Sequence, residues 1–391
     1  MVAPATRAPG RPQYERMRDG DVARIVNNIA TRALADGEAD PAIDRFMADT
    51  ESEFQPDVVH VHHLQFLSST MRFAAPVVVT LHDQWAWCAA GGLGLRNNET
   101  ICEGPEPAAC ADCHAHWRPG PSTAARWLTR GAGFLSPLVE PDRLHRLYKR
   151  IPSSLRPSPL RGDPSIESPR AAAYRNENVL SWYRSADACI APSAHLAGLA
   201  SDHGLGPVEV IRHGVDASWL EPSAERPPDA PFVHIGTIAY HKGTDRVVSA
   251  HRTLTAPSVP ALKLHGPILD PEAACGHPVG RILNPDEVRS VLRGARALVL
   301  GARWPENAPL IISEARAAGC PVIAPDIGGI PELIEDGVDG ILWNPDEDSD
   351  LARAMEALLD QPAKSPNPPP NFEAQVDHIE SVYRRVMKGN G

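Results

Sequence analysis

The chain has 391 residues, of which 42% are hydrophobic, and its net charge is −11. This length and apolar content suffice for two domains with their own cores, whereas the acidic balance argues against nucleic acid as the main partner. No apolar run reaches the roughly 20 residues that cross a bilayer, and the first ten residues lack the apolar segment of a signal peptide. We therefore expect a cytoplasmic protein.

The first half of the chain predicts a sheet only after residue 54. Before that point the sequence is rich in proline and predicts a helix over 22–35, with no opening strand and no glycine-rich loop. Strands alternating with helical patterns follow, which is typical of a parallel, doubly wound sheet. The short apolar runs that predict these strands are 58–62, 77–82, 188–193 and 208–212.

The second half repeats this pattern after a linker. The linker is the proline-rich segment 221–231, and a second proline cluster at 362–370 precedes a last helical pattern over 372–387. The strands predicted in between are 232–236, 261–265, 297–300, 321–324 and 340–343.

The predicted fold is therefore α/β, with two Rossmann-like domains that face a central cleft. We assign 1–221 to a first domain, 222–362 to a second domain, and 363–391 to a linker and a last helix. In such folds the ligand lies at the carboxyl ends of the strands.

One segment of the second domain carries most of the chemical information. Glu306 and Glu314 stand eight positions apart, the first in a Trp-Pro turn after a strand and the second on a helix predicted over about 309–318. Asn307 is a candidate cap for this helix. Backbone N–H groups at a helix start bind anions, and carboxylates accept hydrogen bonds from sugar hydroxyls, so the segment indicates a nucleotide-sugar site.

This segment resembles the donor-binding half of GT-B glycosyltransferases of the family 4 type, the glycosyl transferases group 1. Glu306 and Glu314 match the Glu-x7-Glu motif of that family, and 319–324 and 328–342 match the strand, loop and helix after it. The resemblance covers most of the chain from about residue 54. It implies that 1–221 is the acceptor-side domain, that 222–362 binds the nucleotide sugar, and that the helix within 363–391 returns to the first domain. It implies a retaining hexosyltransferase that moves a sugar from a UDP- or GDP-sugar to a small-molecule or glycan acceptor, by a metal-independent front-face mechanism.

The resemblance also implies roles for individual residues. Glu314 would bind the ribose, Glu306 the transferred sugar, and Lys242 the diphosphate, while His82 at the end of the strand 77–82 would contact the donor sugar. His82, Glu306 and Lys242 are thus the implied catalytic residues. The implied donor-binding residues are Gly236, Thr237, Lys242, Gly266, Ile282, Glu306, Asn307, Ala308, Leu310, Ile311 and Glu314.

Thr237 departs from the family pattern, which often has an arginine five residues before the lysine. On the acceptor side we place His62, His63, Asp83 and His213. Three neighbouring histidines at 60, 62 and 63 invite a metal interpretation, but strand alternation separates them, and we favour structural or acceptor-lining roles.

Four of the seven cysteines lie close together in the sequence, at Cys88, Cys102, Cys110 and Cys113. Four thiolates are enough for a closed structural zinc site; the alternative is unlinked or disulfide-paired cysteines in a surface loop. Catalysis itself requires no cofactor in this interpretation, because no convincing Asp-x-Asp metal motif is present: 346–348 has the spacing but suits a helix start.

A basic stretch over 118–170 contains ten Arg or Lys residues against four acids. It is either a surface for an anionic acceptor or for peripheral contact with the inner face of a membrane, or a solvated arginine-rich face.

Two other functions fit the same fold. A nucleotide-sugar 2-epimerase would need carboxylates for proton abstraction in both domains, and the first domain offers only His82 and Asp83. A non-catalytic nucleotide-sugar-binding scaffold is the other alternative.

Overall fold

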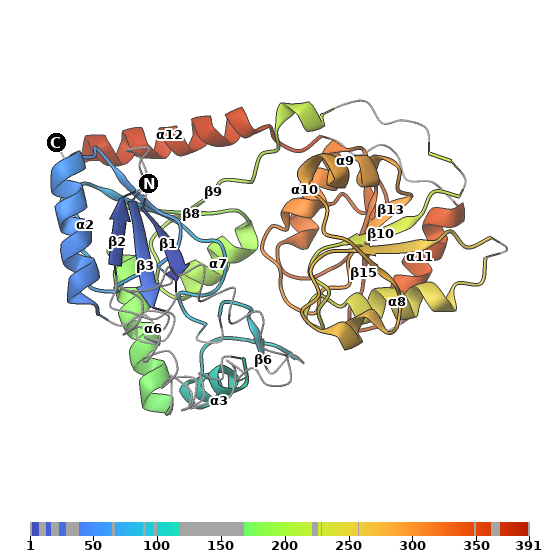
Figure 1. The fold of residues 1–391 in the computed structure, drawn as a ribbon, viewed down its shortest axis with the longest axis horizontal. Helices are drawn as coiled ribbons and strands as arrows, with labels where there is room; N and C mark the ends of the chain where they lie inside the picture. The colour runs from blue at the N-terminus through green and yellow to red at the C-terminus, as the bar shows by residue number, and fades with distance from the viewer. Residues whose placement is uncertain are drawn as a thin grey trace, which may run out of the picture.

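The protein forms two α/β halves that lie side by side (Figure 1). The computed structural model describes residues 2–7, 13–16, 23–28, 39–64, 67–88, 91–96, 100–117, 168–220, 226–227, 229–256, 258–347, 349–360 and 368–389. Because residues 221–225 and 361–367 are not among them, the domain boundaries near 221 and 362 stay predictions. The basic stretch at 118–167 also lies outside the described residues, so its role stays a prediction as well.

The first half is built on a parallel sheet with the strand order β4-β5-β8-β9. Its core combines aliphatic side chains with buried Trp85, Trp182 and Tyr183. The strands are β4 (Val59–Val61), β5 (Val77–Thr80), β8 (Ala188–Ala191) and β9 (Val208–Val210), and the helices around them are α2 (Pro41–Phe54), α6 (Pro169–Arg184) and α7 (Ala194–Asp202). All four predicted strands are thus present.

The N-terminal region differs from the prediction. A strand, β1 (Val2–Arg7), stands where none was predicted, and β3 (Ala23–Asn28) replaces the helix predicted over 22–35. With β2 (Gln13–Arg16) they form a separate sheet in the order β1-β3-β2. The β-branched pair at 25–26 suits the central strand, and Pro4 is tolerated because β1 lies at an edge.

The second half contains a six-stranded parallel sheet with the order β12-β11-β10-β13-β14-β15. The chain moves outward from β10 to β12, then returns to place β13 on the other side of β10. The strands are β10 (Phe232–Ile235), β11 (Leu262–His265), β12 (Val279–Gly280), β13 (Ala297–Val299), β14 (Val322–Pro325) and β15 (Gly340–Trp343). Five of these strands were predicted; the two-residue β12 is too short to leave a sequence signal.

Four α-helices cover the second sheet among the described residues, together with short 3₁₀ turns. The helices are α8 (Thr244–Thr253), α9 (Pro285–Arg293), α10 (Leu310–Ala317) and α11 (Asp350–Asp360), and the turns include η3 (Pro271–Ala274) and η4 (Ile330–Leu333). The order of the strands reverses between β10 and β13, and in open α/β sheets the ligand crevice lies at such a reversal, outside the carboxyl ends of the strands. The loops after β10 and β13 are therefore the structural candidates for a binding site.

The last helix, α12 (Phe372–Gly389), crosses back and packs on the first sheet (Figure 1). Its Val382 is 1% exposed and lies in one apolar cluster with Val78 of β5, Ile190 of β8 and Ile211. No helix in the described part of the chain is long and apolar enough to cross a membrane.

A small satellite follows β5 and precedes α6. It consists of the hairpin β6 (Leu95–Arg96) and β7 (Thr100–Ile101) and the helix α3 (Pro107–Trp117), which packs against α6. Its position directly after the end of β5 places it beside the candidate site.

Candidate active site

Lys242 and Glu306 meet at the point where the strand order reverses. Lys242 lies in the loop between β10 and α8, and Glu306 in the loop between β13 and α10. The ammonium Nζ is 2.7 Å from Glu306 Oε1, and Trp304 Nε1 donates a hydrogen bond of 3.0 Å to the same oxygen. Nζ also lies 4.6 Å from the centre of the Trp304 ring. The carboxylate therefore holds the ammonium in place while both remain partly open to solvent.

The helix α10 begins beside this pair. Its first internal hydrogen bond runs from Ile312 N to Pro309 O at 3.0 Å, which leaves the N–H groups of Leu310 and Ile311 outside the helical ladder, as at any helix start. Glu314 stands one turn further along, half-buried, and burial raises the pKa of its carboxyl. A helix start next to a lysine is favourable for an anion.

Glycine backbones form the wall of the site at the ends of β10 and β11. Gly236 N donates to His265 O at 2.9 Å. Gly266 has φ +149, and a Cβ there would lie 1.8 Å from Gly236 O, so no other residue fits this close approach. The next residue, Thr237, is half-buried. Ile282 lies just after β12 and is 64% exposed.

His82 comes to the site from the first half. The carbonyl oxygen of His82 accepts a hydrogen bond of 2.8 Å from Asn307 Nδ2, which joins the end of β5 to the loop that carries Glu306. Asn307 Oδ1 is buried without a hydrogen-bond partner among the described residues. The site thus draws on both halves of the chain.

A family comparison identifies this region. Residues 279–373 match the family Glycosyl transferases group 1, and this range includes Glu306, α10 and Glu314. This part of the chain is therefore similar to the group 1 glycosyltransferases.

Curated relatives support the same conclusion over a longer range. Glycogen synthase of Mycobacterium tuberculosis (strain CDC 1551 / Oshkosh) is 31% identical over 208 residues, 47% of this chain and 49% of that protein. Alpha-D-kanosaminyltransferase of Streptomyces kanamyceticus is 28% identical over 185 residues, 40% of this chain and 46% of that protein. The chain spans about half the length of the curated relatives it matches.

Solved structures show the fold over nearly the whole chain. Sucrose-phosphate synthase from Thermosynechococcus elongatus has a TM-score of 0.60 at 15% identity and covers 99% of this chain and 89% of its own. HepE of Anabaena, solved in complex with UDP, has a TM-score of 0.50 at 14% identity. The match covers 90% of this chain and 82% of HepE. The predicted α/β GT-B fold is confirmed.

The sequence reasoning about Asn307 was wrong in one respect. The residue that precedes the first turn of α10 is Pro309, with no side-chain cap, whereas Asn307 bonds to His82. The reason is tertiary: a buried amide satisfies the carbonyl of another segment more effectively than a helix start that stays open. Asn307 thus connects the two halves.

The remaining predicted donor-binding residues gather where the resemblance implied. Ala308 and Ile311 are half-buried and pack against an apolar cluster of the second half. Leu310 is 54% exposed. Together with the residues described above, they surround the carboxyl ends of β10, β11 and β13. Their binding roles stay predictions.

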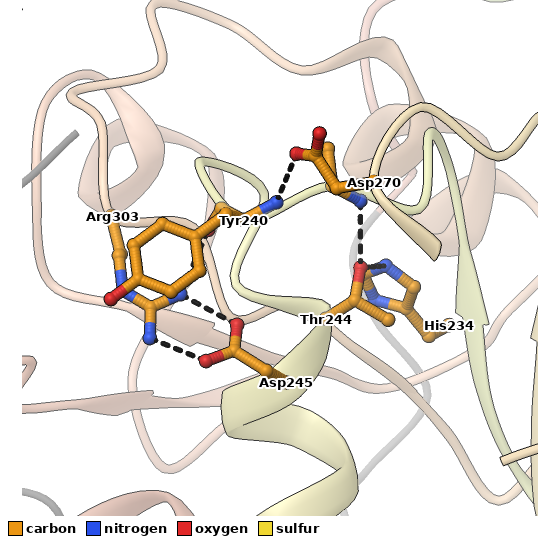
Figure 2. A network of polar contacts seen from close by, with 7 residues as sticks. His234, Tyr240, Thr244, Asp245, Asp270 and Arg303 are labelled. Carbon is orange, nitrogen blue, oxygen red and sulfur yellow. Dashed lines mark hydrogen bonds and ion pairs between the residues drawn. The ribbon is translucent and has the colours of Figure 1, made fainter. Parts of the chain in front are cut away.

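A polar network that the sequence did not reveal fixes the loop that carries Lys242 (Figure 2). Arg303 donates to both carboxylate oxygens of Asp245, at 2.6 and 2.7 Å, and to Tyr240 O at 2.8 Å. Its guanidinium lies 4.0 Å from the Tyr240 ring centre. Asp270 accepts from Tyr240 N at 2.9 Å. The loop is therefore tied to α8, to the segment after β11 and to the loop after β13.

Predicted acceptor-side histidines form a stacked row. His62 Nδ1 lies 3.1 Å from His82 Nε2, and the His62 ring stacks on His60 at 4.2 Å between centres. The rings of His82 and His213 are 6.4 Å apart and nearly parallel. His60 Nδ1 lies 2.5 Å from the Tyr383 hydroxyl of α12.

Both ends of the row attach to α12. Gln375, two turns before Tyr383, accepts from Gly214 N at 2.8 Å and lies 3.5 Å from His213 Nδ1. Residues eight apart share one face of a helix, so α12 positions the row from a single face. His63, the third histidine predicted on the acceptor side, instead pairs with Asp83 at 3.5 Å and lies outside the row. The sequence pattern of α12 alone gives no sign of these contacts.

Acidification is expected to lower the free energy of unfolding. Burial and the neighbouring imidazoles hold the pKa of His60 and of His82 at about 4, below the ordinary 6.5. The unfolded chain therefore takes up these protons first, and the folded state loses stability as the pH falls from 6.5 towards 4. Denaturant titrations at pH 7.5 and at pH 5 measure this loss.

The variant His60→Gln isolates the contribution of the row. An amide can still bond to Tyr383 and to Thr80 Oγ1, which lies 2.8 Å from His60 Nε2, but it does not titrate. Between pH 7.5 and pH 5 the free energy of unfolding of His60→Gln should fall less than that of the wild type. Equal falls would show that the histidine row does not cause the pH dependence.

Glu332 provides a second link between the halves. Its carboxylate accepts from Ala194 N at 2.8 Å and from His195 N at 2.7 Å, the first N–H groups of α7. Replacing it by alanine removes a charged helix cap, so we expect the free energy of unfolding to fall by about 1 kcal/mol. Calorimetry should also show the two halves unfolding less cooperatively. Glu335→Ala, three positions later and exposed, is the matched control; a similar effect there would exclude the capping explanation.

Proposed function

We propose that the protein is a retaining glycosyltransferase that moves a hexosyl group from a UDP- or GDP-sugar to a small-molecule or glycan acceptor. The observation that carries the proposal is the pair of Lys242 and Glu306 beside the start of α10. A flexible cation, a carboxylate and open N–H groups at one point suit a diphosphate bonded to a sugar.

The donor would rearrange the Lys242–Glu306 pair. An incoming diphosphate competes with Glu306 for the ammonium, since both are anions at neutral pH. Once the ammonium bonds to the diphosphate, the Glu306 carboxylate becomes an acceptor for hydroxyls of the transferred sugar. The N–H groups of Leu310 and Ile311 would bind the outer phosphate oxygens, and Glu314 the ribose hydroxyls.

In the proposed front-face reaction the bond between the anomeric carbon and the phosphate oxygen breaks, and its electron pair leaves with the nucleoside diphosphate. The acceptor oxygen forms the new bond on the same face, and its proton passes to the departing phosphate oxygen. Lys242 and the start of α10 supply positive charge to that diphosphate, which is the role that a metal ion has in other transferases. His82 would contact the sugar from the opposite wall.

The direct test is a panel of UDP-, GDP- and TDP-sugars offered to the full chain without added divalent metal. We expect nucleoside diphosphate to be released. Proton NMR of the product should show that the anomeric configuration of the donor sugar is retained. An inverted product would overturn the retaining mechanism. Conversion of the free nucleotide sugar to its 2-epimer would favour an epimerase, and tight nucleotide binding without turnover would favour a scaffold.

A further inference from the structure

The four cysteines that are close in sequence also come together in space. Cys88 follows the turn after β5, Cys102 follows β7, and Cys110 and Cys113 lie one turn apart on α3. All four line one cavity of about 30 Å³ between the hairpin and the helix. Residues three apart on a helix share a face, so α3 presents two thiols to the two that the loops bring.

The two helical cysteines of this cluster are buried. None of the four cysteines takes part in a disulfide. Cys110 and Cys113 are 9% and 7% exposed, so the cluster is covered by its own segment and is separate from the Lys242–Glu306 site.

Among its described side chains, the satellite that carries the cysteines buries one large aliphatic residue, Leu95. Its strands are two residues long each, and α3 contributes Cys110 and Ala111 to a cluster completed by Ala171 and Ala172 of α6. Alanine and cysteine bury little apolar area. Small units of this kind usually depend on a disulfide or a structural metal.

We propose that Cys88, Cys102, Cys110 and Cys113 form a structural zinc site that holds the satellite on the end of β5. Tetrahedral coordination by four thiolates is the commonest closed zinc site and needs sulfurs about 3.8 Å apart. Among the described residues, no group of three or more His, Cys, Asp or Glu side chains stands at metal-binding spacing. The thiols surround the cavity without closing on it.

Binding of a zinc ion would bring the four sulfurs to the spacing of a tetrahedral site. Neutral thiols do not attract one another, and one χ1 rotation moves a sulfur by about 3 Å. Zinc displaces the thiol protons and binds the thiolates, which would draw the sulfurs inward.

The site would act on the active site through the backbone. The segment 91–94 passes directly over the end of β5: a Cβ at Gly92 would lie 2.7 Å from Asp83 Cγ, and one at Gly94 2.6 Å from Gln84 Nε2. Gln84 N also donates to Gly92 O at 3.3 Å. A zinc ion among the cysteines would thus fix the loop that follows His82.

Elemental analysis of the full chain, expressed with zinc and purified without chelator, tests the proposal. We expect about one zinc ion per chain, its loss in Cys113→Ser, and its retention in Cys275→Ser, a half-buried cysteine of the second half. A strong chelator should lower the midpoint of thermal unfolding of the wild type and of Cys275→Ser, but not that of Cys113→Ser. If Cys113→Ser fails to fold, thiol titration of the wild type decides the question.

In the wild type, zinc should protect four of the seven thiols from reaction until the chelator is added. A zinc-free chain in which all seven react at once would overturn the proposal. A zinc-free chain with disulfides at these positions, detected by mass spectrometry, would overturn it equally. Neither result bears on glycosyl transfer, because the cysteines lie outside the proposed reaction.

Discussion

Replacing Lys242 by methionine is expected to reduce kcat for sugar transfer by about 10²- to 10³-fold. Methionine keeps most of the length of the side chain but removes the charge that would stabilise the departing diphosphate. The chain has no arginine at Thr237 to compensate, and Arg303 is already committed to Asp245. Initial rates with a saturating donor, compared between the wild type and Lys242→Met, measure the effect.

Lys263→Met is the matched control for this prediction. Lys263 lies on the neighbouring strand β11 with its side chain exposed, away from the loop after β10. The control should keep wild-type rates and stability. If Lys242→Met raises KM for the donor and leaves kcat unchanged, Lys242 binds donor and transition state equally, and its catalytic assignment is wrong.

The second large effect is expected for the pair of Arg303 and Asp245. Asp245→Asn removes one charge from a bidentate ion pair whose side chains are only 13% and 22% exposed. We expect the free energy of unfolding to fall by about 2 kcal/mol, the scale of hydrogen bonds to charged groups. Because this pair fixes the loop of Lys242, kcat/KM should also fall about tenfold.

An exposed ion pair provides the control for burial. Arg384 and Glu380 pair across one turn of α12 with side chains 63% and 48% exposed, and such pairs contribute little to stability. Glu380→Gln should therefore change neither unfolding nor transfer measurably. Equal effects of the two substitutions would show that the Arg303 network does not position the loop.

The strands of both halves could be predicted from the sequence because their signal is local. Runs such as 77–80 and 322–325 are apolar and β-branched, and strands of a parallel sheet are buried on both faces. The N-terminal strands β1 and β3 were missed because a proline-rich segment hides the local signal, and only their pairing stabilises them.

The grouping of the proposed donor-side residues was predictable for a related reason. Glu306, α10 and Glu314 lie within one continuous segment, so their spacing is visible before folding. Lys242 was found only through the family resemblance. Its contact with Glu306 joins positions 64 residues apart, and the strand order that brings them together follows from packing of the whole sheet.

The sequence by itself thus determined the two α/β halves, the donor motif and the clustering of four cysteines, because each depends on neighbouring residues. The tertiary structure alone decided that Asn307 bonds to His82, that Glu332 caps α7, and that α12 holds a row of histidines from the first half. Each of these contacts joins residues more than 130 positions apart. A buried polar group bonds to whichever partner the fold brings near, and no local pattern encodes that choice.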